Sequence, residues 1–407
     1  MILVIALSLV AATPLRVEKS DSLLARAERQ LRAEESRLIA FRRDLHQHPE
    51  VSGSEERTAG QVAARLRALG LEVRTGVGGH GVVALIRGAR PGPVVAFRAD
   101  MDAVPSNTTD PVDFPSLNKG VRHICGHDVH TTVGVAIAEA LAGQRAELAG
   151  TVMLIFQPAE ERVTGAKAML ADGVFDREKP VAIFAVHTAP LPVGQLGTRP
   201  GPLMASIDVV RVTIGGNGDH KALADSAVRI IRSVSTTTRE AALQGNALDD
   251  ALVSDAVGRP SDGGGRMVQG NISSASADAR ARAKQTILAG LERLRSPGVD
   301  LKVEYEDKFA AGVNNDATLM EHGNAAIAAV LGKGSTVTMP VAPIVFSEDY
   351  GSFQERVPGV LWFLGVSNPE KGTVGMPHTP NYVADEAAIL VGARAMTAVI
   401  LDRLTNP

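Results

Sequence analysis

The stretch that decides the fold is Val94-Val95-Ala96-Phe97-Arg98-Ala99-Asp100-Met101-Asp102. Its first half is apolar enough to form a central strand, and it runs directly into two aspartates. In open α/β sheets, functional side chains lie beyond the carboxyl ends of strands, which is where Asp100 and Asp102 fall. The stretch therefore predicts a sheet edge that carries chemistry.

Short apolar runs and amphipathic helical patterns alternate on both sides of this stretch. Further strands are predicted at residues 73–74, 82–86, 151–157, 181–186 and 360–365. Apolar residues at three- and four-residue steps predict helices within residues 20–71 and at 131–142, 320–331 and 386–404. This alternation predicts an α/β fold with a mostly parallel, helix-covered sheet.

The chain has 407 residues, which is more than one hydrophobic core usually serves, so two domains are expected. After Ser206 the pattern changes: an alternating edge-type strand is predicted at 207–214, helices at 222–234 and 277–294, a glycine-rich linkage at 258–265 and a strand at 301–305. This predicts a smaller α+β lid, residues 207–314, inserted into a catalytic domain made of residues 20–206 and 315–407.

Charge and composition exclude some classes of partner. The net charge is -3 and the charged residues are dispersed, so there is no basic stripe for nucleic acid. Aromatic residues make up only 3%, which argues against stacking platforms for bases. The single cysteine permits no internal disulfide and is either a buried small apolar residue or a ligand.

Residues 1–19 are interpreted as a candidate signal peptide and mature start. The apolar run at 2–12 has signal-peptide length and is far shorter than the roughly 20 residues that span a bilayer. We therefore expect a periplasmic or secreted protein with no membrane segment in its mature form. The alternative is a cytoplasmic protein, because no Lys or Arg precedes the run.

A second stretch, residues 123–130, carries metal-ligand chemistry: His123-Ile124-Cys125-Gly126-His127-Asp128-Val129-His130. Cys125 and His127 are closely spaced at the start of a predicted helix, as expected of residues that hold a transition metal. Asp128 and His130 are expected to surround the ligands rather than to join them. Alone, Cys125 would more often be a structural residue, so the interpretation depends on finding other ligands.

Three later positions supply those ligands. Glu160 and Glu161 follow a predicted strand, His187 ends another, and His378 lies in a loop between two prolines. Each alone would more often be structural, such as a histidine that bonds a backbone carbonyl, so the case rests on their convergence. The set of Cys125, His127, Glu161, His187 and His378 exceeds one tetrahedral zinc and suits two metal ions. Glu160 is then left to accept a proton from an activated water.

At this point the sequence resembles the M20 metallopeptidase family, in its amidohydrolase branch of hippurate hydrolases, N-acyl-amino-acid deacylases and auxin-conjugate hydrolases. The matching stretches run in order along nearly the whole catalytic part: Arg42 to Glu50, Phe97 to Pro105, Ile124 to Thr132, Gln157 to Glu161, His187 to Ser206, Ser347 to Asp349 and Pro377 to Glu386.

The resemblance implies a dinuclear catalytic domain with an inserted lid that often dimerises. It implies the same five metal ligands, Glu160 as general base and Asp100 as a residue that orients the site. His220 matches a lid histidine that, in this family, reaches the active site of the partner subunit and polarises the scissile carbonyl.

The lid departs from the family pattern. The usual Gly-Gly-His is Gly218-Asp219-His220 here, and the asparagine expected within residues 262–269 is missing. An arginine expected in the second half of the lid is replaced within residues 270–274, and Arg266 and Arg280 are candidate substitutes. These departures bear on carboxylate recognition and leave the metal site unchanged.

The leading hypothesis is a metal-dependent amidohydrolase that uses two divalent ions, Zn or Mn, to cleave N-acyl amino acids or similar small amides. The first alternative is a carboxypeptidase or dipeptidase of the same family. The second is a catalytically inactive homologue that keeps the metal for structure alone. The acyl group, the amine part and the native metal stay open.

Overall fold

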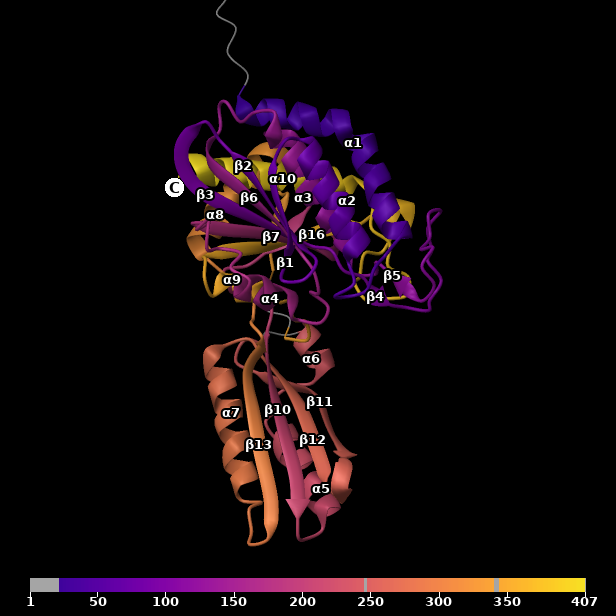
Figure 1. Cartoon of the computed structure of the whole chain (residues 1–407), viewed down its shortest axis with the longest axis vertical. Coiled ribbons are helices and arrows are strands. Elements are labelled where there is room, and N and C mark those ends of the chain that lie inside the picture. The colour runs from indigo at the N-terminus through magenta and orange to yellow at the C-terminus, as the bar shows by residue number, and fades with distance from the viewer. Residues whose placement is uncertain (1–21, 245–246, 340–343, 407) are drawn as a thin grey trace, which may run out of the picture.

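The computed structural model describes residues 22–244, 247–339 and 344–406. Figure 1 shows two bodies joined by a narrow waist, an upper body around a large sheet and an elongated lower body around a smaller one. The candidate signal peptide, residues 1–19, lies outside the described residues. In the described part of the chain, no helix is both long and apolar enough to cross a membrane.

The upper body is built on an eight-stranded sheet with the order β1-β2-β6-β3-β7-β16-β8-β15. The pairs β6–β3, β3–β7, β7–β16 and β8–β15 are parallel, and the other three pairs are antiparallel. The strands are β1 (Glu72–Val77), β2 (Gly81–Arg87), β3 (Arg90–Asp100), β6 (Ala149–Gln157), β7 (Ala182–Pro192), β8 (Leu196–Thr198), β15 (Thr336–Thr338) and β16 (Gly359–Ser367). The predicted mostly parallel α/β sheet is confirmed, with β3 inside it.

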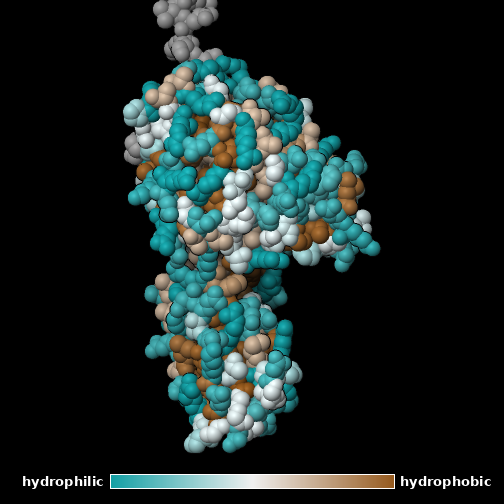
Figure 2. Space-filling view, viewed as in Figure 1, coloured by the Kyte–Doolittle hydropathy of each residue, from teal (hydrophilic) through white to brown (hydrophobic). Residues whose placement is uncertain are grey.

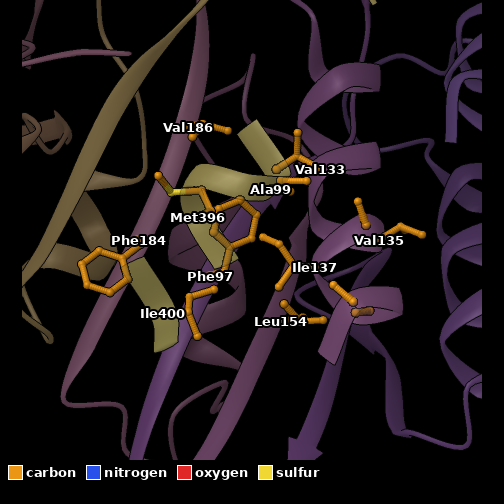
Figure 3. Close-up of a cluster of buried hydrophobic side chains, with 14 of the residues drawn as sticks. Phe97, Ala99, Val133, Val135, Ile137, Leu154, Phe184, Val186, Met396 and Ile400 are labelled. Atoms are coloured by element: carbon orange, nitrogen blue, oxygen red, sulfur yellow. The ribbon is translucent and has the colours of Figure 1, made fainter. Parts of the chain in front are cut away.

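Helices cover both faces of this sheet because its strands are apolar on both sides. In β6, Leu154 belongs to the core on one face and Met153 to the core on the other. The first core is covered by α1 (Leu23–Gln47), α2 (Glu56–Ala68), α3 (His127–Ala142), α8 (Ala317–Leu331) and α10 (Ala387–Thr405). The second is covered by the short helices α4 (Gly165–Ala171) and α9 (Gly351–Gln354). Figure 3 shows the first core, where Phe97 and Leu154 lie among side chains of α3 and α10.

The lower body is an antiparallel four-stranded sheet with two long helices packed on one face. Its order is β11-β12-β10-β13, from β10 (Ser206–Gly216), β11 (Ala251–Pro260), β12 (Arg266–Ser274) and β13 (Val299–Ala310). The helices α5 (His220–Arg232) and α7 (Ala277–Glu292) share a core with the sheet, and α6 (Arg239–Gln244) is short. Hydrophilic side chains predominate on the viewed surface of both bodies (Figure 2).

Two predictions for the lower body are wrong. The predicted edge strand, β10, lies between β12 and β13, so it is an inner strand. The predicted glycine-rich linkage at 258–265 is largely the end of β11 and a tight 3-10 turn, η1 (Asp262–Gly264), that leads into β12. A register shift between Val253 and Asp255 interrupts the alternation in β11, which is why its period-two pattern does not stand out in the sequence.

Short paired strands mark the places where the chain turns beside the waist and the site. β9 (Gly201–Pro202) pairs with β14 (Asn314–Asn315) close to where the chain leaves and re-enters the upper body. β4 (Val104–Pro105) pairs with β5 (Val121–Arg122), and η2 (Pro369–Lys371) follows β16. As domain limits, the boundaries after 206 and 314 stay predictions.

Candidate metal centre and active site

The candidate ligands meet at one edge of the upper sheet. β3 and β6 are parallel neighbours with Asp100 opposite Gln157, so the two strands end at the same edge. The Glu160–Glu161 pair follows the end of β6, and His187 lies within β7, which extends to Pro192 rather than ending at the histidine. His127 is the first residue of α3, four positions earlier than the predicted helix start.

All five predicted ligands come together there. Their donor atoms fall in three overlapping groups in which every pair of atoms lies within 4.8 Å: Cys125–His127–His187, Cys125–Glu161–His378 and His127–Glu160–Glu161. His378 Nε2 lies 3.2 Å from Glu161 Oε1, and His187 Nε2 lies 3.4 Å from Cys125 Sγ. Cys125 links the two histidine-containing ends of the cluster, so one continuous set of sulfur, nitrogen and oxygen donors results.

Two histidines are held so that their Nε2 atoms face this cluster. His127 Nδ1 bonds Asp102 Oδ1 at 3.1 Å, and His187 Nδ1 donates to the Thr188 carbonyl at 2.9 Å. Burial, followed by the charge of His130, lowers the pKa of His187 to about 3, so the ring is neutral and its Nε2 lone pair is available. A carboxylate or carbonyl on the far nitrogen is the usual support of a metal-bound imidazole.

Unpartnered buried atoms show that the donor set fits cations. Apart from the contact between Glu161 Oε1 and His378 Nε2, the buried atoms His127 Nε2 and Glu161 Oε1 have no hydrogen-bond partner among the described residues. A buried polar atom without a partner is costly unless something satisfies it, and both of these atoms point into the cluster. Thiolate, imidazole and carboxylate together are donors that divalent transition metals accept.

The electrostatics of the cluster also call for positive charge. Hydrogen bonds to Cys125 and Glu161 raise the pKa of His378 to about 10. Burial opposes protonation of His127, yet Asp100 and Cys125 hold the pKa of its ring well above the usual value. Burial and the neighbouring Glu348 and Glu161 raise the pKa of Glu160. All three groups take up protons to offset excess negative charge, which bound cations would offset instead.

Glu160 occupies the position expected of a proton carrier. Its side chain is buried, and its Oε2 lies 3.9 Å from His127 Nε2. It also belongs to a group with Glu348 and Asp349, in which one oxygen of each carboxyl group lies within 4.8 Å of the others. A carboxyl group beside the candidate ligands is placed to accept a proton and return it.

Asp102, to which the sequence pattern assigned no particular role, supports two ligands at once. In addition to His127 Nδ1, it accepts hydrogen bonds from the Glu161 backbone N–H at 2.9 Å and from the Ser52 hydroxyl. Both the ring of His127 and the backbone of Glu161 are therefore fixed by one buried carboxylate. The sequence signal for this role was the spacing of Asp100 and Asp102 at the end of the strand. Alternate residues of a strand face the same side, so both aspartates could be expected to face the site.

Asp100 lies in the site but contacts a different histidine. It bonds His130 Nδ1 at 2.5 Å and Arg98 Nη1 at 2.6 Å, whereas His127 Nε2 is 3.8 Å away. His130 Nε2 accepts from the Thr188 N–H at 2.8 Å, so both of its ring nitrogens are occupied. We therefore leave His130 outside the ligand set, although it lies close enough to Asp100 and His127 to form a further donor group.

A fully buried arginine forms the floor of the site. Arg98 donates to Asp100, to Glu348 Oε1 at 2.7 Å and to Asp349 Oδ1 at 3.2 Å. It also donates to Gln157 Oε1 at 2.8 Å and thereby joins β3 to β6. One guanidinium faces three carboxyl groups, and burial raises the pKa of Asp349, so a proton there can relieve part of the repulsion. The sequence pattern gave no role to Arg98, Glu348 or Asp349.

Unusual backbone conformations gather at the site. Among the described residues, four that are not glycine have positive φ, and three of them are Ala159, Val163 and His378. Ala159 and Val163 flank the glutamate pair, and His378 is itself a candidate ligand. Such conformations cost of order 1–3 kcal/mol each and persist where the surrounding structure fixes them, which is common at functional sites.

Gly126 explains how α3 can begin so close to the ligands. Its φ of 86° lies in the left-handed region, and a Cβ there would collide with the side chains of Tyr382 and Thr188. A residue with a side chain would push the loop that carries Tyr382 away from the cysteine. Gly126 is therefore required between Cys125 and His127.

His220 is not brought to this cluster within one chain. It begins α5 after Gly216, the end of β10, and that strand runs roughly 30 Å away from Ser206 at the waist. Its side chain is half-buried, and its two ring nitrogens face the carbonyls of Gly264 at 3.1 Å and Gly216 at 2.8 Å. The lid histidine therefore contacts only its own lid.

The two arginines considered for carboxylate recognition are also in the lid. Arg280 lies 3.3 Å from Asp208 and 3.1 Å from Asp307, so its charge is already paired. Arg266 begins β12 opposite Ile214 and Pro260, at the end of the lid away from the waist. Neither lies in the donor cluster.

Comparison with known proteins gives consistent matches. The sequence profile of peptidase family M20/M25/M40 matches residues 96–402. The chain is 32% identical to thermostable carboxypeptidase 2 of Saccharolobus solfataricus over 88% of this chain and 93% of that protein. It is 34% identical to N-acetylcysteine deacetylase of Bacillus subtilis over 90% of this chain and 97% of that protein.

The fold has a solved counterpart. The Bacillus subtilis YxeP protein, described as a dinuclear metal-binding peptidase from the M20 family, superimposes with a TM-score of 0.76 at 31% identity. The match covers 92% of this chain and 99% of that one, so it includes both bodies.

Proposed function

The chain belongs to peptidase family M20/M25/M40 and is a hydrolase of amide or peptide bonds, and we propose that it cleaves N-acyl amino acids or similar small amides at a dinuclear metal centre. The observation that carries the proposal is the convergence of Cys125, His127, Glu161, His187 and His378, with buried atoms aimed at the cluster.

We propose that these five side chains hold two divalent ions, zinc or manganese. When bound, the ions would polarise the amide carbonyl and lower the pKa of a water molecule. Thiolate and imidazole favour zinc, whereas carboxylate donors also suit manganese. Metal analysis of protein purified without added ions distinguishes the two.

Glu160 then carries the proton through the reaction. It accepts a proton from the attacking water and later donates it to the amine nitrogen as the C–N bond breaks. Asp102 keeps the His127 ring and the Glu161 backbone in place during these steps, and Arg98 keeps Glu348 and Asp349 beside Glu160. Water adds to the carbonyl carbon, and a carboxylic acid and an amine leave.

The test is the variant Glu160→Gln, which keeps the shape of the side chain and removes its base. It is expected to keep the bound metal and lose roughly 10²- to 10⁴-fold in kcat. A matched control is Glu139→Gln, because Glu139 is a partly buried glutamate that pairs with Arg65 away from the cluster. Full turnover by Glu160→Gln would refute the assignment of the base.

The substrate class needs a panel, because relatives of both kinds match the chain. N-acetyl and N-benzoyl amino acids represent the proposed reaction, and dipeptides represent the carboxypeptidase or dipeptidase alternative. The ratio of kcat/KM values decides between them. Metal at full occupancy without hydrolysis of any amide would instead indicate the inactive homologue.

We also propose that the chain forms a homodimer through its lid, so that His220 serves the partner subunit. The proposal is supported by the distance of His220 from its own cluster and by its position at the far end of the lid, where it is only half-buried. Its backbone contacts would have to be exchanged for a substrate contact. Light scattering of the purified protein tests the dimer.

Export to the periplasm or the medium is proposed from the apolar run at residues 2–12. Cell fractionation and N-terminal sequencing of the mature chain test it. A full-length chain in the cytoplasm would refute it.

A further inference from the structure

His378 is the candidate ligand on the least regular backbone. It lies in the loop between η2 and α10, its side chain is 51% exposed, and its φ is 60°. Glu161 also lies in a turn but its side chain is only 14% exposed, and the buried Cys125, His127 and His187 lie in a strand, at a helix start or beside one. Something other than secondary structure must therefore hold His378 against Cys125 and Glu161.

Two tethers reach this loop from the segment just before Cys125. The His378 backbone N–H donates to the Ile124 carbonyl at 2.8 Å. Two residues further along the loop, the Pro380 carbonyl accepts from Arg122 Nη1 at 3.1 Å. The first tether is backbone and needs no particular side chain, whereas the second depends entirely on Arg122.

Arg122 is itself fixed by a second loop. Its side chain is 3% exposed, and it bonds Thr108 Oγ1 at 2.5 Å and Asp110 Oδ1 at 2.8 Å. Thr108 and Asp110 lie in the connection between β4 and β5. The planar guanidinium thus spans three acceptors on two loops, which a lysine ammonium on a flexible stem cannot reproduce.

The contacts continue to the start of α3. Asp110 Oδ2 lies 3.0 Å from His46 Nε2, and His46 Nδ1 lies 2.8 Å from Asp128 Oδ2. Arg42 pairs with the same carboxylate at 2.8 Å. Burial would raise the pKa of Asp110, but the hydrogen bond and charge of His46 and the hydrogen bond of Arg122 hold it well below its usual range, so its charge persists.

We propose that Arg122 is a positioning residue that holds the His378 loop at the metal centre through Pro380. The inference rests on the proposed function, since it concerns one ligand of the proposed dinuclear site. The series of contacts Arg122–Asp110–His46–Asp128 ends next to His127 in the sequence. One buried network therefore connects His127 with the loop that carries His378. Arg122 does not contact the donor atoms and acts only through the loop.

The test compares Arg122→Gln with a matched control, Arg394→Gln. Arg394 also bonds one carboxylate and one carbonyl, Glu28 at 2.7 Å and Val330 at 2.6 Å, but it joins α10 to α1 and α8 rather than the site loops. Hydrogen exchange is measured on metal-free protein over residues 376–384, and zinc binding is measured by titration.

In Arg122→Gln, amide exchange over residues 376–384 is expected to accelerate about tenfold while α3 exchanges as in wild type. The second zinc equivalent is expected to bind about 10- to 100-fold more weakly, the usual cost of losing support of a ligand. Arg394→Gln is expected to match wild type in both measurements. Loop exchange and zinc binding by Arg122→Gln that equal those of Arg394→Gln would overturn the proposal.

Arg122→Lys keeps the charge opposite Asp110 and serves if the glutamine variant does not fold. It is expected to lose loop protection as well, because one ammonium cannot span the three acceptors. Wild-type exchange and zinc binding in a folded Arg122→Lys would overturn the proposal. Failure of the proposed function looks different, since wild-type protein itself would then bind fewer than two zinc ions.

Discussion

The upper body and the lid differ in how completely one chain assembles its functional residues. In the upper body, five candidate ligands lie together and two of the histidines have their far nitrogens fixed by Asp102 and a backbone carbonyl. In the lid, His220, the one histidine expected to act, is half-buried and faces backbone carbonyls of the lid itself. The difference teaches that one chain brings the candidate metal ligands together without the lid, whereas a catalytic role of His220 requires the partner subunit that we propose.

The two bodies also differ in their buried charge. In the upper body, Arg98 is buried among the carboxyl groups of Asp100, Glu348 and Asp349, and all four side chains are less than 2% exposed. The ion pairs of the lid, such as Lys221–Asp225, are mostly exposed. Buried charges are costly unless they are fully paired, so their retention at the sheet edge points to a role beyond stability.

The largest effect should come from removing the metal ions, which acts on the upper body alone. Dialysis against a chelator is expected to reduce turnover by about 10³-fold or more, because the polarisation supplied by the ions is worth several kcal/mol. Hydrogen exchange in the lid should not change. Metal-free protein that retains full activity would contradict a metal-dependent site in the upper body.

The next largest effect should come from His220→Ala, which removes the only proposed catalytic group of the lid. A loss of roughly 10²- to 10³-fold in kcat is expected if the ring polarises the carbonyl. Mixing His220→Ala chains with Glu160→Gln chains should restore activity, because a mixed dimer contains one site with both groups intact. Two inactive variants that stay inactive when mixed would contradict a role across the subunits.

Removing a buried carboxylate of the upper body should lower the free energy of unfolding more than removing an exposed carboxylate of the lid. Burial would raise the pKa of Asp128, but Arg42 and His46 hold it well below its usual range. Its stabilisation is therefore present above about pH 4 and is lost as the pH falls below that value. Asp128→Asn is expected to lower the free energy of unfolding at pH 7 by roughly 3 kcal/mol.

The measurement is denaturant unfolding of wild type and Asp128→Asn at pH 7 and at pH 3, where the difference should shrink. The control in the lid is Asp225→Asn, whose exposed carboxylate pairs with Lys221, and no measurable change is expected. Equal destabilisation by both substitutions would contradict a larger contribution of the buried Asp128 to stability.

The smallest effect on activity should come from Asp102→Asn, which keeps the ligands and loosens their support. A 10- to 100-fold loss in metal affinity or activity is expected, because the amide keeps only one of the two acceptor oxygens that hold the ring of His127 and the backbone of Glu161. Asp44→Asn is a suitable control, since Asp44 pairs with Arg57 at the surface. Unchanged metal affinity in Asp102→Asn would show that Asp102 is not what holds His127 and Glu161 in place.

The same contrast explains what the sequence could predict. Strands in the upper body are continuous apolar runs followed at once by polar ligands, so the α/β sheet and the five ligands could be proposed from local pattern alone. In the lid, the strands at 251–260 and 266–274 are interrupted by glycines and a bulge, and their period-two signal was missed.

The supporting residues were hidden for a different reason. Arg98 contacts Glu348 and Asp349 across 250 and 251 positions, and Arg122 contacts Pro380 across 258. No local periodicity encodes contacts at such separation, because they exist only once the sheet and its loops have assembled. Asp102 was accessible in principle, since it is two residues from Asp100 at the same strand exit.

The most direct test of the central claim is the number of divalent ions that one chain binds at the sheet edge. Zinc titration of metal-free wild-type protein, followed by elemental analysis after gel filtration, should give two ions per chain. His378→Ala, which removes one exposed ligand, should retain one. Wild-type protein that binds no more than one ion, or a His378→Ala variant that still binds two, would contradict a dinuclear centre built from these five residues.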